Sequence, residues 1–188
     1  MTSFYSKEEA EGLGFKCLGK NALISRKASF YGVSRISIGN NVRIDDFTVL
    51  SAGAGGIKIG NYVHISVSSS LIGEGAITLG DYSGISSRVA IFSSNDDYSG
   101  KFMTNPTVPK ELTGVVHADV KICRHVIIGA GSVILPGVTL NEGAAVGALS
   151  LIHKDCEAFF IYAGNPAKKL LRRRRDLLEL EKKIPKAL

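Results

Sequence analysis

An aliphatic residue recurs at every sixth position along most of this chain, and this period constrains the fold more than any other feature. A unit of six residues is too short for a pair of helices, but it fits a short strand followed by a corner. A fixed period of this length indicates a β-helix, in which successive coils stack on one another. The residues that carry the period are Ile38, Ile44, Leu50, Ile59, Ile65, Leu71, Leu79, Ile85, Ile91, Ile122, Ile128, Ile134, Leu140, Val146 and Ile152.

The residues around each aliphatic position agree with strands joined by corners. A glycine often follows, as at Gly39 and Gly129, and glycine frees the backbone at a corner. The residue two positions before the next aliphatic residue is small or β-branched, as at Val63 before Ile65. Because side chains alternate between the two faces of a strand, both of these positions should face the interior.

The period divides the chain into a lead-in, a repeat region with an insertion, and a C-terminal segment. Residues 1–17 predict a short helical lead-in, since Ser6 to Glu9 match a helix capping box. Residues 18–165 are predicted to form the β-helix. Within them, residues 93–117 break the period with a long polar loop, and such loops in compact domains are usually functional. Residues 166–188 carry leucines at helical spacing, which predicts an amphipathic helix that caps the coil stack.

Charge and cysteine content narrow the range of partners. The net charge is +6, and much of the excess lies in Lys168, Lys169 and residues 172–175. Such a run is compatible with a nucleic-acid or membrane surface, with the solvated face of a helix, or with a site for an anionic cofactor. The three cysteines are widely spaced, which predicts reduced thiols in a cytoplasmic protein. No apolar run long enough to span a bilayer is present, so we expect no membrane insertion.

The hexads, the interrupting loop and the closing sequence of residues 164–168 together resemble the hexapeptide-repeat acyltransferases, in particular sugar acetyltransferases of the galactoside and maltose type. The resemblance implies an all-β fold, a left-handed parallel β-helix of triangular section. It also implies a homotrimer with active sites between neighbouring subunits, and acetyl-CoA as the cosubstrate. Galactoside-type members carry a catalytic histidine in the loop, whereas residues 93–98 of this chain contain none.

Acyl transfer to a hydroxyl or an amine needs a base, and a neutral imidazole suits that role near pH 7. Because the loop lacks a histidine at the expected place, either the base comes from elsewhere in the chain or the chemistry differs. The four histidines are His64, His117, His125 and His153. Their spacing does not resemble that of zinc ligands, and no other cluster of metal-ligating residues is present, so we predict no metal.

His64 is the strongest candidate for the base. It lies between Val63 and Ile65, which are predicted to face inward, so its own side chain should point outward. The hexad phase places Arg43 level with it on one neighbouring coil and Gly84 on the other. The pattern therefore predicts a cleft that holds a base and a cation, with open space over Gly84. An ordinary exposed histidine is the alternative, and His117 and His125 remain further candidates for the base.

Three groups of side chains complete the predicted site. The base is His64, and Asp96 or Asp97 from the loop is predicted to orient its imidazole or to hold a substrate hydroxyl. The residues predicted to contact the acceptor are Arg43, Asn95, Asp96, Asp97, Tyr98 and His117. The resemblance implies that CoA lies along the late coils, and the predicted CoA contacts are Gly129, Ala130, Ser132, Gly147, Ala148, Ser150 and Lys168.

The main functional prediction is an acetyltransferase that moves an acetyl group from acetyl-CoA to a sugar hydroxyl, in the synthesis of bacterial surface polysaccharide. One alternative is N-acetylation of an amino sugar carried on a nucleotide. This alternative gains support because the candidate histidine lies on a coil and not in the loop. Another is a non-catalytic hexapeptide-repeat scaffold, against which the outward His64 and the polar loop argue. The expected partners are two further copies of the chain, acetyl-CoA and a sugar or nucleotide-sugar acceptor, with no nucleic acid.

Overall fold

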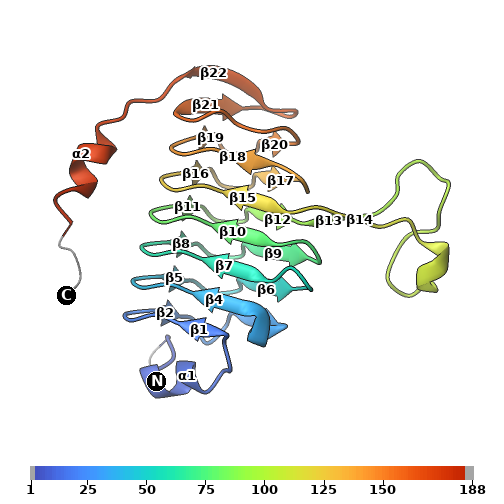
Figure 1. Cartoon of the computed structure of the whole chain (residues 1–188), viewed down its shortest axis with the longest axis horizontal. Helices are drawn as coiled ribbons and strands as arrows, with labels where there is room; N and C mark the ends of the chain where they lie inside the picture. The colour runs from blue at the N-terminus through green and yellow to red at the C-terminus, as the bar shows by residue number, and fades with distance from the viewer. Residues whose placement is uncertain (1–2, 185–188) are drawn as a thin grey trace.

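The computed structural model describes residues 3–184, which form a column of stacked triangular coils (Figure 1). Each regular coil contributes one strand to each of three parallel sheets, and equivalent strands of neighbouring coils pair in register. The column is the left-handed parallel β-helix that the resemblance implied. Within the described residues, no helix is long and apolar enough to cross a bilayer.

The three sheets are called here the first, second and third, in the order in which the chain visits them. The first sheet contains β1 (Cys17–Leu18), β4 (Ile36–Ile38), β7 (Ile57–Ile59), β10 (Ile77–Leu79), β15 (Val120–Ile122) and β18 (Thr139–Leu140). The second contains β2 (Leu23–Ile24), β5 (Arg43–Ile44), β8 (His64–Ile65), β11 (Gly84–Ile85), β16 (Ile127–Ile128), β19 (Ala145–Val146), β21 (Phe160–Ala163) and β22 (Lys168–Arg172). The third contains β3 (Ser29–Tyr31), β6 (Val49–Ala52), β9 (Ser70–Gly73), β12 (Ala90–Phe92), β17 (Val133–Ile134) and β20 (Leu151–Ile152).

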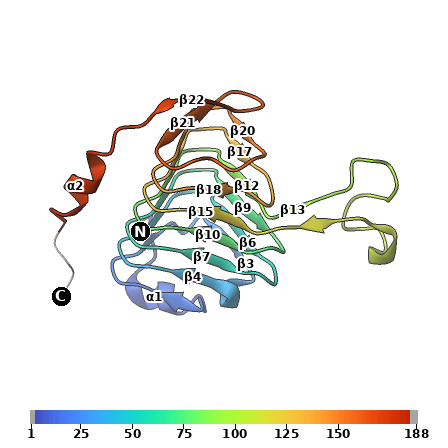
Figure 2. The same ribbon diagram turned by 45° about the horizontal axis from the view of Figure 1, so that its top comes forward.

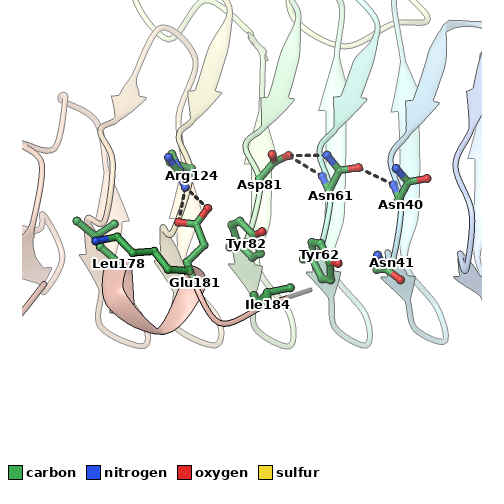
Figure 3. A pocket seen from close by; sticks show the side chains of 11 residues that line it. Asn40, Asn41, Asn61, Tyr62, Asp81, Tyr82, Arg124, Leu178, Glu181 and Ile184 are labelled. Carbon is green, nitrogen blue, oxygen red and sulfur yellow. Dashed lines mark hydrogen bonds and ion pairs between the residues drawn. The ribbon is translucent and has the colours of Figure 1, made fainter. Parts of the chain in front are cut away.

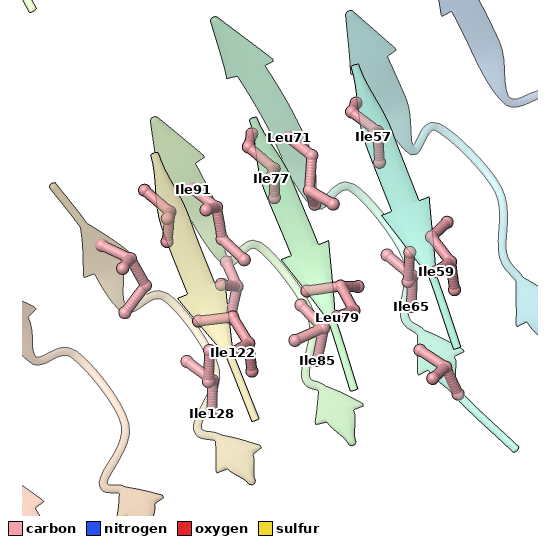
Figure 4. Packing of buried hydrophobic residues seen from close by; sticks show 14 of the residues in the cluster. Ile57, Ile59, Ile65, Leu71, Ile77, Leu79, Ile85, Ile91, Ile122 and Ile128 are labelled. Carbon is pink, nitrogen blue, oxygen red and sulfur yellow. The ribbon is translucent and has the colours of Figure 1, made fainter. Parts of the chain in front are cut away.

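The aliphatic residues of the six-residue period form the core of the column (Figure 4). Each of them is buried, and Ile65 on β8 and Ile85 on β11 are at most 1% exposed. The residue two positions earlier also faces inward, as Val63 and Ser83 do. Burial of one aliphatic side chain stabilises the fold by about 1.5–3 kcal/mol. Layers of such residues therefore supply the main driving force for stacking, as the period predicts.

The N-terminal lead-in contains the predicted helix, α1 (Lys7–Glu11). Its start is a capping box, in which the Ser6 hydroxyl accepts from the amide of Glu9 and the Glu9 carboxylate accepts from the amide of Ser6. A short 3-10 helix, η1 (Val33–Arg35), precedes β4.

The insertion leaves the column at the corner between the third and first sheets, since it joins β12 to β15. Its two ends pair as the antiparallel strands β13 (Ser94–Asn95) and β14 (Val116–His117), and it carries a second 3-10 helix, η2 (Lys110–Leu112). The loop beyond this pair extends away from the coils (Figures 1 and 2).

The predicted C-terminal helix over residues 166–188 is wrong for most of its length. Residues 168–172 instead form β22, which pairs antiparallel with β21, and the only helix there among the described residues is α2 (Leu177–Glu181). The last parallel strand would otherwise leave its backbone amides and carbonyls unpaired, and β22 satisfies them. A strand therefore covers the end of the stack, and α2 lies beside the column (Figure 2). Residues 185–188 of the predicted helix lie outside the described residues.

Candidate active site

His64 lies on β8 with its side chain on the outer face of the second sheet, as predicted. Its strand pairs with β5 on one side and β11 on the other, so that His64 is level with Arg43 and with Gly84. Half of the imidazole is exposed, while the neighbouring Val63 and Ile65 are buried. The hexad phase thus placed the base candidate correctly.

A carboxylate that the sequence reasoning missed holds the imidazole. Asp45 follows β5, and its Oδ2 lies 2.7 Å from Nε2 of His64. Its other oxygen, Oδ1, accepts a hydrogen bond of 2.6 Å from Nε of Arg43. Partial burial raises the pKa of Asp45, but the hydrogen bonds from His64 and Arg43 outweigh burial and hold that pKa below its usual range. Asp45 is therefore ionised at neutral pH, in contact with both the imidazole and the guanidinium.

The contact with Asp45 determines which ring nitrogen of His64 can accept a proton. An ionised carboxylate only accepts hydrogen bonds, so Nε2 of His64 carries the hydrogen that faces Asp45. In the neutral ring the other nitrogen, Nδ1, then has a free lone pair. Asp45 would also stabilise the imidazolium that forms when Nδ1 takes a proton. The arrangement can thus perform general base catalysis on the outer face of the sheet.

Open space lies beside the imidazole, over Gly84. A Cβ atom built on Gly84 would meet only Cγ1 of Ile127, at 3.9 Å. Ile127 is on the next coil, level with Gly84, and is 45% exposed. On the other side of His64, the guanidinium of Arg43 lies 5.5 Å from the ring centroid of Phe4 in the N-terminal lead-in. Gly84 therefore lies between Ile127 on one side and the Arg43–His64 pair on the other, and no side chain fills the position between them.

Within one chain it is Asp45, and not a carboxylate of the loop, that contacts His64. The insertion leaves the corner that lies opposite the second sheet, whereas His64 is on the second sheet. Asp97 instead accepts hydrogen bonds from the Ser99 hydroxyl and the amide of Gly100. Tyr98 is 86% exposed. Asp45 orients the imidazole because it belongs to the adjacent coil, about 4.8 Å away in a parallel sheet.

Two of the other histidines are held by local contacts. The ring of His117 accepts or donates a hydrogen bond of 2.8 Å between its Nδ1 and the Ser94 hydroxyl, at the base of the insertion. His125 is buried, stacks on Tyr82 with 5.0 Å between ring centroids, and lies 2.7 Å from a carboxylate oxygen of Glu181. Each of these two rings thus has a polar partner within the chain.

A groove of about 580 Å³ lies between α2 and the corner that joins the first and second sheets (Figure 3). Glu181 of α2 pairs there with Arg124, and Tyr62 and Tyr82 stack face to face. The side chains of Asn61 and Asp81 accept hydrogen bonds from backbone amides of the preceding coil. None of the predicted site residues lines this groove. Its polar groups bind one another, so we place the candidate active site at His64 and not here.

The predicted CoA residues fall into two groups. Ala130, Ala148 and Lys168 are exposed, the two alanines at the corner between the second and third sheets. Ser132 and Ser150 are buried, and each donates from its hydroxyl to the carbonyl of Gly147. The prediction that these two serines contact CoA is therefore wrong, because their hydroxyls face the interior.

The two predicted glycines at this corner, Gly129 and Gly147, have a structural reason to lack a side chain. A Cβ at Gly129 would come within 2.5 Å of the backbone of the next coil. A Cβ at Gly147 would lie 3.0 Å from the side chain of Ala163. Close coil packing therefore accounts for both glycines, whatever binds at this corner.

Neither a metal site nor a thiolate at Cys156 is found among the residues that the structure describes. No group of three or more histidine, cysteine, aspartate or glutamate side chains in residues 3–184 could hold a metal ion. Burial raises the pKa of the Cys156 thiol to about 12, so it carries no thiolate nucleophile at neutral pH.

No protein-family model matches the chain, but individual proteins of known activity do. The chain is 56% identical over 179 residues to a dTDP-4-amino-4,6-dideoxy-D-glucose acyltransferase of Escherichia coli, covering 95% of this chain and 93% of that protein. It is 45% identical to AntD, an N-acyltransferase from Bacillus cereus solved in complex with dTDP and 3-hydroxybutyryl-CoA. The two structures superpose with a TM-score of 0.92 over 97% of this chain and 96% of AntD.

A more distant structure shares the fold alone. A maltose O-acetyltransferase from Clostridium difficile 630 is 18% identical, with a TM-score of 0.52 over 90% of this chain and 75% of that one. The β-helix is thus common to enzymes that differ widely in sequence. On the strength of its identity to the Escherichia coli protein along nearly the whole of both chains, this protein belongs to the hexapeptide-repeat acyltransferases, in the family of the dTDP-4-amino-4,6-dideoxy-D-glucose acyltransferases.

Proposed function

We propose that this protein transfers an acyl group from a CoA thioester to the amine of a dTDP-linked 4-amino-4,6-dideoxy sugar. The observation that carries the proposal is the His64–Asp45 pair beside the open space at Gly84, in a chain 56% identical to an acyltransferase for that sugar. AntD is also an N-acyltransferase. Between the two acceptors that the sequence left open, both relatives favour the amine over the sugar hydroxyl.

The site can support a direct transfer. The neutral amine nitrogen attacks the carbonyl carbon of the thioester, so that a carbon–nitrogen bond forms and the carbon–sulfur bond breaks. Nδ1 of His64 takes the proton that the nitrogen loses and passes it to the departing CoA sulfur, which leaves as the free thiol. Asp45 stabilises the imidazolium between these two proton transfers. A positioned base of this kind contributes about 10²–10⁴ to the rate.

The donor is proposed to be acetyl-CoA, bound along the corner between the second and third sheets. The exposed methyl side chains of Ala130 and Ala148 leave the backbone of this corner accessible to an extended ligand. Lys168 follows on β22 and is exposed, so its ammonium group is available to CoA phosphates. Arg43 is proposed to attract the anionic acceptor, since its guanidinium is half exposed beside His64.

The working form is proposed to be a homotrimer in which the loop of one subunit reaches the His64 site of its neighbour. This proposal is supported by apolar side chains that a single chain leaves exposed, namely Phe102 and Met103 on the loop and Leu23 on the second sheet. The same arrangement would bring Asn95, Asp96, Asp97, Tyr98 and His117 near an acceptor. We place the protein in the cytoplasm, where its three free thiols would stay reduced, and its product in the synthesis of surface polysaccharide.

The test compares two acceptors that differ at one atom. The protein is incubated with acetyl-CoA and either dTDP-4-amino-4,6-dideoxyglucose or dTDP-6-deoxyglucose, which carries a hydroxyl in place of the amine. Release of the CoA thiol is followed by absorbance and the acylated product by mass spectrometry. We expect release with the amine and an amide product. Equal turnover of the hydroxyl acceptor would restore the original prediction, and no release with either would refute the proposal.

A further inference from the structure

Gly84 is a glycine that the fold does not require. Of the 21 glycines in the chain, every other one either has a positive φ or would place a Cβ within 3.4 Å of a neighbouring atom. At Gly84 the φ is not positive, and the nearest atom to a Cβ would be 3.9 Å away. Glycine in a strand costs conformational entropy and contributes no packing. The absence of a side chain here therefore calls for a reason other than folding.

The position of Gly84 supplies that reason. It is level with His64 on the preceding coil and with Ile127 on the next. Because neighbouring strands of a sheet lie about 4.8 Å apart, the backbones that carry these two side chains are roughly 9–10 Å apart. The result is a slot on the outer face of the second sheet, with an imidazole on one wall and an exposed aliphatic side chain on the other. Any side chain at Gly84 would rise between the two walls.

We infer that this slot, formed by His64, Gly84 and Ile127, selects the acceptor by its 6-deoxy carbon as well as by its amine. The inference rests on the proposed function and deepens it. In a 4-amino-4,6-dideoxy sugar the amine on C4 and the methyl group on C5 are neighbours on one edge of the ring. With the amine at Nδ1 of His64, the methyl group packs on Ile127.

The two walls therefore match the two substituents of a 6-deoxy amino sugar. A 6-hydroxy sugar would place a hydroxyl against Ile127 and lose hydrogen bonds to water there. Aliphatic pockets reject an added hydroxyl by no more than about 10²-fold, and this slot is open on one side. We expect the wild-type protein to prefer the 6-deoxy acceptor by about 10–100-fold in kcat/KM.

The first experiment fills the slot. Gly84→Ala and Gly84→Val add side chains that suit a strand and meet no atom closer than ordinary contact at the Cβ. We expect the acceptor KM to rise by about tenfold or more in Gly84→Val and by less in Gly84→Ala. The acetyl-CoA affinity should stay the same, and the melting temperature should stay level or rise. Ala145→Val is the matched control, since it enlarges the same face one coil beyond Ile127 and should leave the acceptor KM unchanged.

The second experiment changes the aliphatic wall. Ile127→Thr should lower the preference for the 6-deoxy over the 6-hydroxy amino sugar, because its hydroxyl can pair with that of the acceptor. An acceptor KM within twofold of wild type in Gly84→Val, or an unchanged preference in Ile127→Thr, would overturn the inference while the wild-type protein still acylates the amino sugar. A wild-type protein that leaves the amino sugar unmodified would overturn the proposed function and this inference with it.

Discussion

Replacing Asp45 by asparagine tests whether the carboxylate supports the base. The substitution keeps the shape of the side chain and removes the charge that faces His64 and Arg43. Two unit charges about 4 Å apart interact by about 4 kcal/mol at the effective dielectric constant of a protein surface. Because half of the imidazole is exposed, solvent screens part of this interaction, and we expect a loss of about 1.4–2.8 kcal/mol. That loss corresponds to a tenfold to hundredfold fall in kcat.

The assay measures kcat at saturating acetyl-CoA and acceptor, together with the KM for each. We expect kcat to fall in Asp45→Asn while the KM for acetyl-CoA is unchanged, and Asp45→Glu to recover part of the rate. Asp46→Asn is the matched control, because that carboxylate contacts Ser25 and Lys27 and does not touch His64. The reasoning is refuted if Asp45→Asn keeps a kcat within twofold of wild type, or if Asp46→Asn loses as much.

Four further outcomes are expected. Ile65→Ala should lower the free energy of unfolding by about 2–5 kcal/mol in urea titrations, because the substitution leaves a cavity in a close-packed layer of the core. A loss below about 1 kcal/mol would contradict that packing. Glu181→Gln should speed amide hydrogen exchange in α2 without changing the melting temperature, since it removes the charge that pairs with Arg124 and His125; unchanged exchange would mean that other contacts hold the helix. Lys168→Ala should raise the Kd for acetyl-CoA about tenfold and reduce the salt dependence of binding. An unaltered Kd would mean that Lys168 does not bind the CoA phosphates. Light scattering should give three times the chain mass of 20.0 kDa, and a stable monomer would exclude a shared active site.

The sequence predicts the core and the position of His64 because both depend on one period. Strand alternation and the six-residue phase determine which side chains face inward, and they placed Ile65 inside and His64 outside, level with Arg43 and Gly84. The same phase predicts that Ser132 faces inward. The expectation that it contacts CoA came from the resemblance, and the phase was the better guide.

Features outside the period were not predictable in the same way. Asp45 lies where β5 ends. The six-residue period does not determine how far a side chain at a corner reaches toward the next coil, so the contact with His64 could not be predicted. Residues 168–172 have leucines at a spacing that suits a helix, but the unpaired edge of β21 decides their structure. That edge exists only once the coils have stacked, so local sequence does not reveal it. The period does not identify the acceptor either, since an imidazole base can serve an amine or a hydroxyl.

The most direct test of His64 as the base is the kcat of His64→Asn with dTDP-4-amino-4,6-dideoxyglucose and acetyl-CoA. We predict a fall of about 10²–10⁴ with the melting temperature, the oligomeric state and the acetyl-CoA affinity unchanged, because an outward side chain contributes little to the core. His153→Asn is the control, because this exposed histidine lies outside the proposed site, and it should keep kcat within a few-fold of wild type. A His64→Asn protein with near-normal kcat, or a His153→Asn protein that loses as much, would contradict the assignment.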